Sequence, residues 1–246
     1  MKDRLKPAAA IAGFCLVWVL ILFTTSAVVY SMAGDKALLA EQMLRFAPPE
    51  ESGLPENEYP EMGKMIAGFL TGSEPVFQYI YTDGENNRVA CFQPHEAEHM
   101  ADCRGLILLA ETIRRITGIA ALILIGAGIM LRGRRKSFAS GMLVGLFFAA
   151  VVFFAVLLWG IVSFDSLFTA FHRLAFTHDG WLLDARTDLL IRLMPTPFFI
   201  SLGIRVLLTV LAAALVSLAA AAVIRRTENR SKGADAPRMN AERRAE

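Results

Sequence analysis

The residues of this chain best suited to proton transfer near neutral pH are its four histidines. His95 and His99 stand close together in the first half of the chain, and His172 and His178 in the second. Histidine has an ordinary pKa of about 6.5, so it can both accept and donate a proton under these conditions. Two histidines brought to one site could therefore act as a general base and a general acid.

The first pair of histidines also matches a metal-binding pattern. Residues 95–99 read H-E-A-E-H, the H-E-x-x-H spacing that places two zinc ligands on one helix face with a glutamate as base. A zinc site needs a third ligand, for which His172 or Asp165 is available. The pattern is short and begins directly after Pro94, at the end of an expected helix. A zinc-dependent membrane protease is therefore the alternative and not the main interpretation.

The elements that must position these histidines include four long apolar blocks. The chain has 246 residues, of which 55% are hydrophobic, and a mean hydropathy of +0.47. About 20 residues are needed to cross the roughly 30 Å hydrocarbon core of a bilayer, where the backbone must be helical. Four blocks meet this length: 8–30, 113–131, 138–162 and 198–224. The sequence thus predicts an all-α membrane protein with four transmembrane helices.

Charge predicts the orientation of these helices. Basic residues gather before the first block, between blocks two and three, and after block four, which are on one side of a four-span protein. By the positive-inside rule that side is cytoplasmic, so both termini are expected there and all four histidines on the outer side. A polybasic tail beside a membrane fits anionic lipid, and no nucleic-acid partner is expected.

The chain should then divide into six consecutive segments. The outer part comprises a small α+β cap between spans one and two and a second, shorter segment between spans three and four. The expected segments are 1–33 (cytoplasmic N-terminus and span one), 34–104 (cap), 105–162 (spans two and three with a basic link), 163–197 (second outer segment), 198–224 (span four) and 225–246 (cytoplasmic tail).

Local patterns predict the elements inside these outer segments. In the cap, apolar spacing near 3.6 favours helices at 35–46 and 59–71, and a loop at 50–58. Alternating residues at 76–82 and 88–92 favour a hairpin with its turn at Asp83-Gly84. A helix should start at Pro94 and lead into span two, with a bend near Gly105 or a protruding end. The second segment should contain helices around 164–171 and 184–194. Cys91 and Cys103 both lie outside the membrane and could form a disulfide, which the sequence leaves open.

The two histidine segments resemble one known family. Residues 96–102, E-A-E-H-M-A-D, resemble the E-x-x-H-M-x-D segment of the bacterial lipoprotein intramolecular transacylases. Residues 168–176, F-T-A-F-H-R-L-A-F, resemble the F-x-x-F-H-x-x-x-F of the same family, and the pattern continues at Trp181, Asp184 and Asp188 and beyond. The resemblance covers most of residues 8–224. Cys103, Ala185 and Thr196 depart from the pattern, and His95 and His178 lie outside it.

The resemblance implies a reaction and a set of residues. Such enzymes move the sn-2 acyl chain of a diacylglyceryl-modified lipoprotein to the α-amino group of its N-terminal cysteine, giving a lyso-form lipoprotein. No cofactor and no metal is implied, because the reaction occurs within one substrate molecule. His99 and His172 would be the catalytic pair, with His172 as base and His99 as acid or oxyanion support. Further residues have expected roles: Asp102 and Glu96 as orienting residues, and Phe168, Phe171, Phe176, Trp181, Arg114 and Arg115 as residues that bind the substrate.

Two further expectations complete this interpretation. The protein should act as a monomer in the cytoplasmic membrane, in contact with membrane lipid and with diacylglyceryl-modified lipoproteins. His95 and His178 should be surface or turn residues. A non-enzymatic membrane assembly factor is a further alternative, and it predicts that His99 and His172 can be replaced without functional loss.

Overall fold

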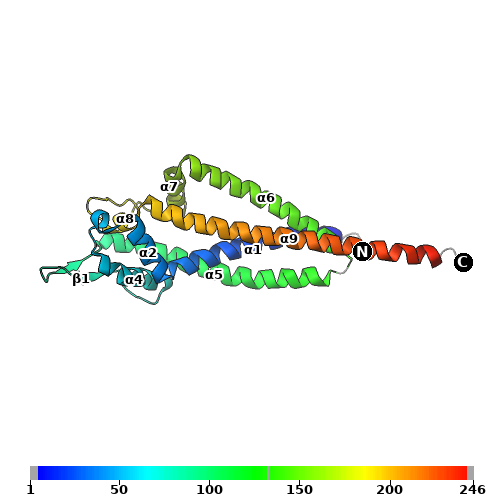
Figure 1. The fold of residues 1–246 in the computed structure, drawn as a ribbon, viewed down its shortest axis with the longest axis horizontal. Helices are drawn as coiled ribbons and strands as arrows, with labels where there is room; N and C mark the ends of the chain where they lie inside the picture. Colours follow the sequence, from blue (N-terminus) through cyan, green and yellow to red (C-terminus); the bar gives the residue numbers. More distant parts are fainter. Residues whose placement is uncertain (1–4, 132, 243–246) are drawn as a thin grey trace. The chain divides into compact units, whose positions relative to one another are not determined.

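The computed structural model describes residues 5–131 and 133–242, with side chains described for residues 6–131 and 133–228. Within these residues, four helices are long and apolar enough to cross a membrane. They are α1 (Leu5–Ala33), α5 (Pro94–Met130), α6 (Arg135–Val162) and α9 (Thr196–Glu242) (Figure 1). Because α9 continues as helix to Glu242, it extends well past the end of block four, where a tail was expected.

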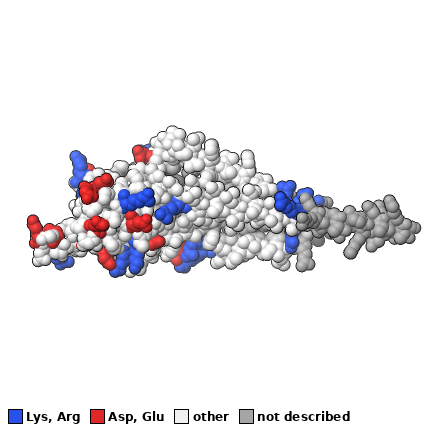
Figure 2. Space-filling model, viewed as in Figure 1, with Lys and Arg blue, Asp and Glu red and all other residues white. Residues whose placement is uncertain are grey.

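The chain forms two compact units. The helix unit comprises residues 1–24, 115–157 and 209–246, and the cap unit comprises residues 25–114 and 158–208. Acidic and basic side chains gather over α2, α4 and β1 of the cap unit, whereas the visible surface of α6 is almost uncharged (Figure 2). All four histidines belong to the cap unit.

Close backbone contact holds α1 against α6 in the helix unit. Gly13 and Gly141 lie where the two helices meet, and a Cβ at either glycine would collide with a backbone carbonyl of the other helix. Small residues allow this approach, and close packing is a main source of attraction between helices in lipid. Around the contact, Val17, Ala139 and Met142 are almost fully buried.

The cap unit is mostly helical. Its short elements are α2 (Lys36–Phe46), α3 (Pro49–Ser52), η1 (Glu56–Glu58), α4 (Tyr59–Thr71), β1 (Ile80–Thr82), β2 (Arg88–Ala90), α7 (Phe164–Ala175) and α8 (Leu189–Leu193). Asp35 begins α2 by accepting hydrogen bonds from the backbone N–H groups of Ala37 and Leu38. Helix α2 then packs on α4, where Gly63 lets the two backbones approach.

The short elements differ from expectation in three places. Residues 50–58, expected as a loop, include the end of α3 and all of η1, and residues 53–55 between these two helices are the part without regular structure. The hairpin strands are only three residues long, pair Ile80 with Ala90, and are joined through residues 83–87, where Asn86 has a φ of 65°. The Asp83 carboxylate accepts the backbone N–H groups of Glu85 and Asn87, which widens the turn. The helix expected at 184–194 is limited to α8, because residues 184–188 form a turn.

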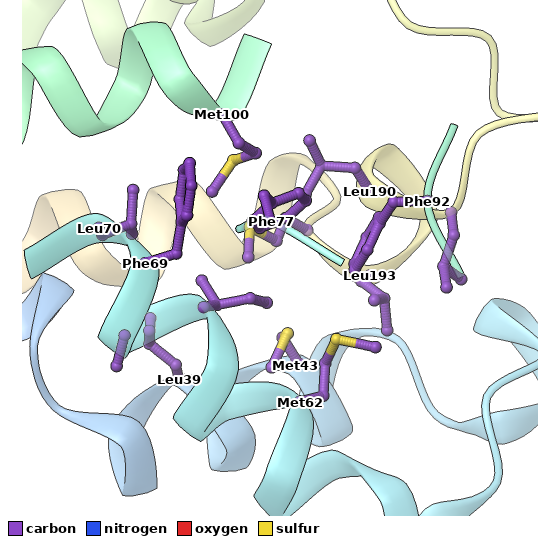
Figure 3. Close-up of a cluster of buried hydrophobic side chains, with 14 of the residues drawn as sticks. Leu39, Met43, Met62, Phe69, Leu70, Phe77, Phe92, Met100, Leu190 and Leu193 are labelled. Carbon is purple, nitrogen blue, oxygen red and sulfur yellow. The ribbon is translucent and has the colours of Figure 1, made fainter. Parts of the chain in front are cut away.

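A shared apolar core ties these elements together. Three aromatic rings meet in it, from Phe69 of α4, Phe77 just before β1 and Phe92 just after β2. The ring centroid of Phe77 lies 5.2 Å from that of Phe69 and 4.5 Å from that of Phe92 (Figure 3). Leu190 and Leu193 of α8 and Met100 of α5 close the core from the other segments. Each fully buried side chain of this size contributes about 1.5–3 kcal/mol. The core therefore fixes the position of α8 and of the first turns of α5, the helix that carries His95 and His99.

Candidate active site

Helix α5 brings His99 to the site and begins with a capping arrangement. Pro94 is its first residue, where a missing N–H costs nothing, and Glu96 accepts the backbone N–H of Gln93 at 2.7 Å. The second oxygen of Glu96 accepts the backbone N–H of Leu190, at the start of α8, also at 2.7 Å. Glu96 is completely buried. Its carboxylate therefore joins the start of α5 to the second outer segment.

Helix α7 carries His172 and sets its protonation. Ser163 begins the helix by accepting the N–H of Ser166. One turn before its end, Nδ1 of His172 lies 2.8 Å from the carbonyl oxygen of Phe168. A carbonyl can only accept, so Nδ1 carries the proton and Nε2 of the neutral ring carries a lone pair. Burial lowers the pKa of His172, against the opposing effect of this hydrogen bond. The ring is thus a neutral base at physiological pH.

The two expected catalytic rings lie together. The centroids of His99 and His172 are 6.1 Å apart, and the residues are only 8% and 7% exposed. Nε2 of His99 is 3.6 Å from the sulfur of Cys103, one turn further along α5. Among the described residues, nothing hydrogen-bonds the buried Nδ1 of His99. A substrate oxygen or nitrogen placed between the rings could therefore interact with both.

Aromatic side chains enclose this pair. Phe176 lies 5.2 Å from His99 and 5.5 Å from His172, and Trp181 lies 4.9 Å from His172. Phe168 lies 4.1 Å from His172 on its other side, and Phe171 meets the same ring edge to face at 5.4 Å. These four are the aromatic residues that the sequence singled out. They give the histidines apolar surroundings in which hydrogen bonds to a substrate are strengthened.

The other two histidines each contact an aspartate across the outer segments. His178, in the turn after α7, places Nε2 3.0 Å from the carboxylate of Asp102 on α5. His95 at the start of α5 places Nε2 3.0 Å from Asp188, just before α8. Both histidine side chains are about half exposed, as expected for surface residues. The sequence, however, indicated no partner for either.

Asp188 is a site residue whose position the sequence left unexplained. It is 2% exposed, and it accepts hydrogen bonds from Thr187, from the backbone N–H of Asp184 and from His95. Burial opposes its ionisation, but these contacts together outweigh burial and hold the pKa of Asp188 below its usual range. In the sequence, two aspartates four residues apart just before a helix indicate a turn, and this pattern could have pointed to the buried position of Asp188.

The expected orienting and arginine residues do not contact His99 or His172 in the way that the sequence predicted. Asp102 contacts His178, and Glu96 contacts two backbone groups, so neither is hydrogen-bonded to His99. Arg114 lies 3.9 Å from Glu111 and stacks over Tyr30, 15 residues after His99, or about 22 Å along a helix. Arg115 belongs to the helix unit. Contact of Arg114 with the reacting atoms at His99 is therefore excluded by distance.

The residues of the H-E-x-x-H pattern are not arranged as a zinc site. Glu96, which would serve as the base, uses both oxygens to accept backbone N–H groups. His95 contacts Asp188, whereas His99 faces His172. Within the described part of the chain, no three His, Cys, Asp or Glu side chains are arranged to hold a metal ion. Cys91 and Cys103 are both free thiols, and burial raises the pKa of Cys91 to about 11.

Comparison with known proteins gives a family match. The family model described as "Lipoprotein intramolecular transacylase Lit" matches residues 11–199, which include both buried histidines and the aromatic residues around them. A comparison with curated proteins found no match.

Solved structures share the fold. The membrane-integral lipoprotein intramolecular transacylase of Bacillus cereus matches with a TM-score of 0.70 and 18% identity, covering 92% of this chain and 99% of that one. A variant of the same protein with a histidine replaced by arginine matches with a TM-score of 0.64 and 18% identity, covering 94% of this chain and 96% of that one. A variant with a histidine replaced by alanine matches with a TM-score of 0.64 and 17% identity, covering 93% of this chain and 97% of that one. These matches confirm the expected fold class, four membrane helices with a small cap, and a multi-pass membrane protein.

Proposed function

This chain belongs to the lipoprotein intramolecular transacylase family and is an acyltransferase, and from that premise we propose the reaction that its histidine pair performs. The substrate is a diacylglyceryl-modified lipoprotein, whose sn-2 acyl chain moves to the α-amino group of its own N-terminal cysteine. The product is a lyso-form lipoprotein. The observation that carries this proposal is the 6.1 Å separation of two buried imidazoles inside an aromatic enclosure.

His172 acts as the base. The neutral amine attacks the sn-2 ester carbonyl, a C–N bond forms, and nitrogen must then lose a proton. Nε2 of His172 has the lone pair to take it, since Nδ1 is held protonated by Phe168. Burial keeps the pKa of His172 low, so the ring remains unprotonated until the nitrogen of the intermediate becomes acidic.

His99 acts as the oxyanion donor. The thiol of Cys103 can donate to Nε2 of His99, which leaves the proton on Nδ1. That buried Nδ1 has no hydrogen-bond partner among the residues that the structure describes. It can donate a hydrogen bond to the carbonyl oxygen as negative charge develops. As the ester C–O bond breaks, the glycerol oxygen takes the proton that His172 removed from the nitrogen, and both rings return to their starting state.

The confined site contributes by orientation. Amine and ester belong to one molecule, so the enzyme needs no acyl-enzyme step, only a fold of the headgroup that brings them together. Phe168, Phe171, Phe176 and Trp181 surround that headgroup. Holding reacting groups at contact distance can supply roughly 7–11 kcal/mol of the barrier in favourable intramolecular cases.

The charge distribution supports an orientation in the cytoplasmic membrane. The basic link after α5 and the basic residues after residue 224 lie on the cytoplasmic side, together with both termini. The cap at 34–104 and the segment at 163–197, with the active site, then lie on the extracytoplasmic face. One chain supplies both histidines, which supports action as a monomer.

A labelled lipopeptide tests the reaction. Purified protein in detergent is given a diacylglyceryl-cysteinyl peptide with different acyl chains at sn-1 and sn-2, and mass spectrometry identifies which chain becomes an amide. We expect the sn-2 chain on nitrogen, a loss of at least about a hundredfold in His99→Ala and His172→Ala, and activity within about threefold in His95→Ala. An unchanged substrate, or full activity in His172→Ala, would contradict the proposal.

A further inference from the structure

The turn between α7 and α8 carries a contact that the proposed reaction does not use. This turn, residues 177–188, holds Trp181 against His172 at 4.9 Å between ring centroids. Three residues before Trp181, His178 reaches α5 and places Nε2 3.0 Å from the carboxylate of Asp102. The contact lies one helical turn from His99 on α5.

Hydrogen bonding fixes how His178 makes this contact. The backbone N–H of Gly180 donates to Nδ1 of His178 at 3.1 Å, so Nδ1 carries a lone pair and Nε2 carries the proton that faces Asp102. A Cβ at Gly180 would lie only 2.9 Å from that Nδ1, so glycine is what allows the close approach. The imidazole is thus held on one side by its own turn and on the other by α5.

The two ends of the turn are held independently. At the far end, Asp188 is buried and binds His95, Thr187 and the backbone of Asp184. At the near end, the part that carries Trp181, the tie to α5 is His178. Between them, Leu182 is 62% exposed, whereas Leu183 packs against the apolar core of the cap unit. Leu183 therefore holds the turn on the far side of Trp181 and the His178 contact holds it on the near side, so the position of Trp181 depends on the His178 contact as well.

We propose that His178 is a positioning residue: with Asp102 it holds the 177–188 turn on α5, and so holds Trp181 over the ring of His172. The inference rests on the proposed function, in which His172 is the base. His178 touches neither substrate nor the reacting atoms. It acts on catalysis by keeping the indole in place beside the imidazole, which sets the direction of the Nε2 lone pair.

Activity measurements test the proposal with the lipopeptide assay. His178→Ala should lower kcat about fivefold, a modest fraction of what misplaced catalytic groups can cost, with KM changed less than twofold. His178→Gln should restore most of the rate, because its amide has both a donor for Asp102 and an acceptor for Gly180. The matched control is Arg186→Ala, which breaks an exposed ion pair with Asp184 in the same turn and should leave kcat unchanged.

A double-mutant cycle separates this role from general destabilisation. In a Trp181→Phe background, His178→Ala should cost little further, because the group it positions is already altered. Equal losses in both backgrounds, no loss in His178→Ala, or failure of His178→Gln to restore the rate would each overturn the proposal.

A fluorescence measurement is independent of the reaction. With Trp18 and Trp159 replaced by phenylalanine, Trp181 is the single tryptophan, since the chain has three. Acrylamide quenching of Trp181 should rise about twofold in His178→Ala and stay unchanged in Arg186→Ala. Unchanged quenching in His178→Ala refutes the positioning role even if the transacylase activity is absent, so the two proposals fail separately.

Discussion

Replacing Glu96 by glutamine tests how the two outer segments are joined. The carboxylate accepts two backbone N–H groups at 2.7 Å, one at the start of α5 and one at the start of α8, from a completely buried position. Glutamine has one oxygen and one NH₂ group, so one backbone N–H would face another donor. Losing one such charge-assisted bond in a buried site costs about 2 kcal/mol.

The expected cost is large enough to measure in the whole protein. For chains of this size about 2 kcal/mol corresponds to a fall in melting temperature of roughly 4–8 °C. Thermal unfolding of detergent-solubilised protein, followed by tryptophan fluorescence, measures it. Glu98→Gln is the matched control, because it makes the same change two residues away on an exposed position and should melt as the wild type does.

Two outcomes would refute the reasoning on Glu96. If Glu96→Gln melts within about 1 °C of the wild type, the two hydrogen bonds do not contribute as the geometry indicates. If Glu96→Gln removes all activity while its melting temperature is unchanged, Glu96 is a chemical participant and not a structural link.

Three further predictions concern pH and packing. Because burial lowers the pKa of His172, the acid limb of kcat should have its midpoint below 6.5, and a midpoint above that value would contradict the assigned base. The contacts of Asp188 hold its pKa below 3.8, so they stabilise the fold above about pH 4 and are lost as pH falls further. The difference in melting temperature between wild type and Asp188→Ala should therefore shrink from pH 7 to pH 3. A constant difference would argue against a stabilising role of these contacts. Gly141→Ala should lower the melting temperature by several degrees, because its Cβ meets a backbone carbonyl, whereas Gly126→Ala, with open space around it, should not; equal melting of the two would show that α1 and α6 do not touch there.

The sequence predicted the spans and the candidate pair for separate physical reasons. Long apolar blocks leave helices as the only backbone solution in lipid, so α1, α5, α6 and α9 followed from hydropathy. His99 and His172 followed from their flanking residues in a family resemblance. Their approach in space did not, because it requires contacts between segments far apart in the sequence, such as the Glu96 contact with a backbone N–H 94 residues away, and a single sequence carries no record of such pairs.

The misplaced expectations have a common origin. Asp102 was expected to orient His99 because it lies one turn away on α5, yet it contacts His178 in a separate segment. The helix expected from residue 184 begins at Leu189, because Asp188 accepts a local backbone N–H and a hydroxyl that favour a turn. In both cases the structure depends on which group an aspartate carboxylate binds, and the spacing of apolar residues along the chain carries no information about that partner.

The hydrogen bond between His172 and Phe168 has a consequence for substrate entry. Donor and acceptor belong to the same helix, four residues apart, so no other element is needed to keep the proton on Nδ1. If α7 shifts to admit a bulky lipid headgroup, the base travels with its tautomer already assigned. A movement of the aromatic residues around His172 would therefore leave the tautomer of this ring unchanged.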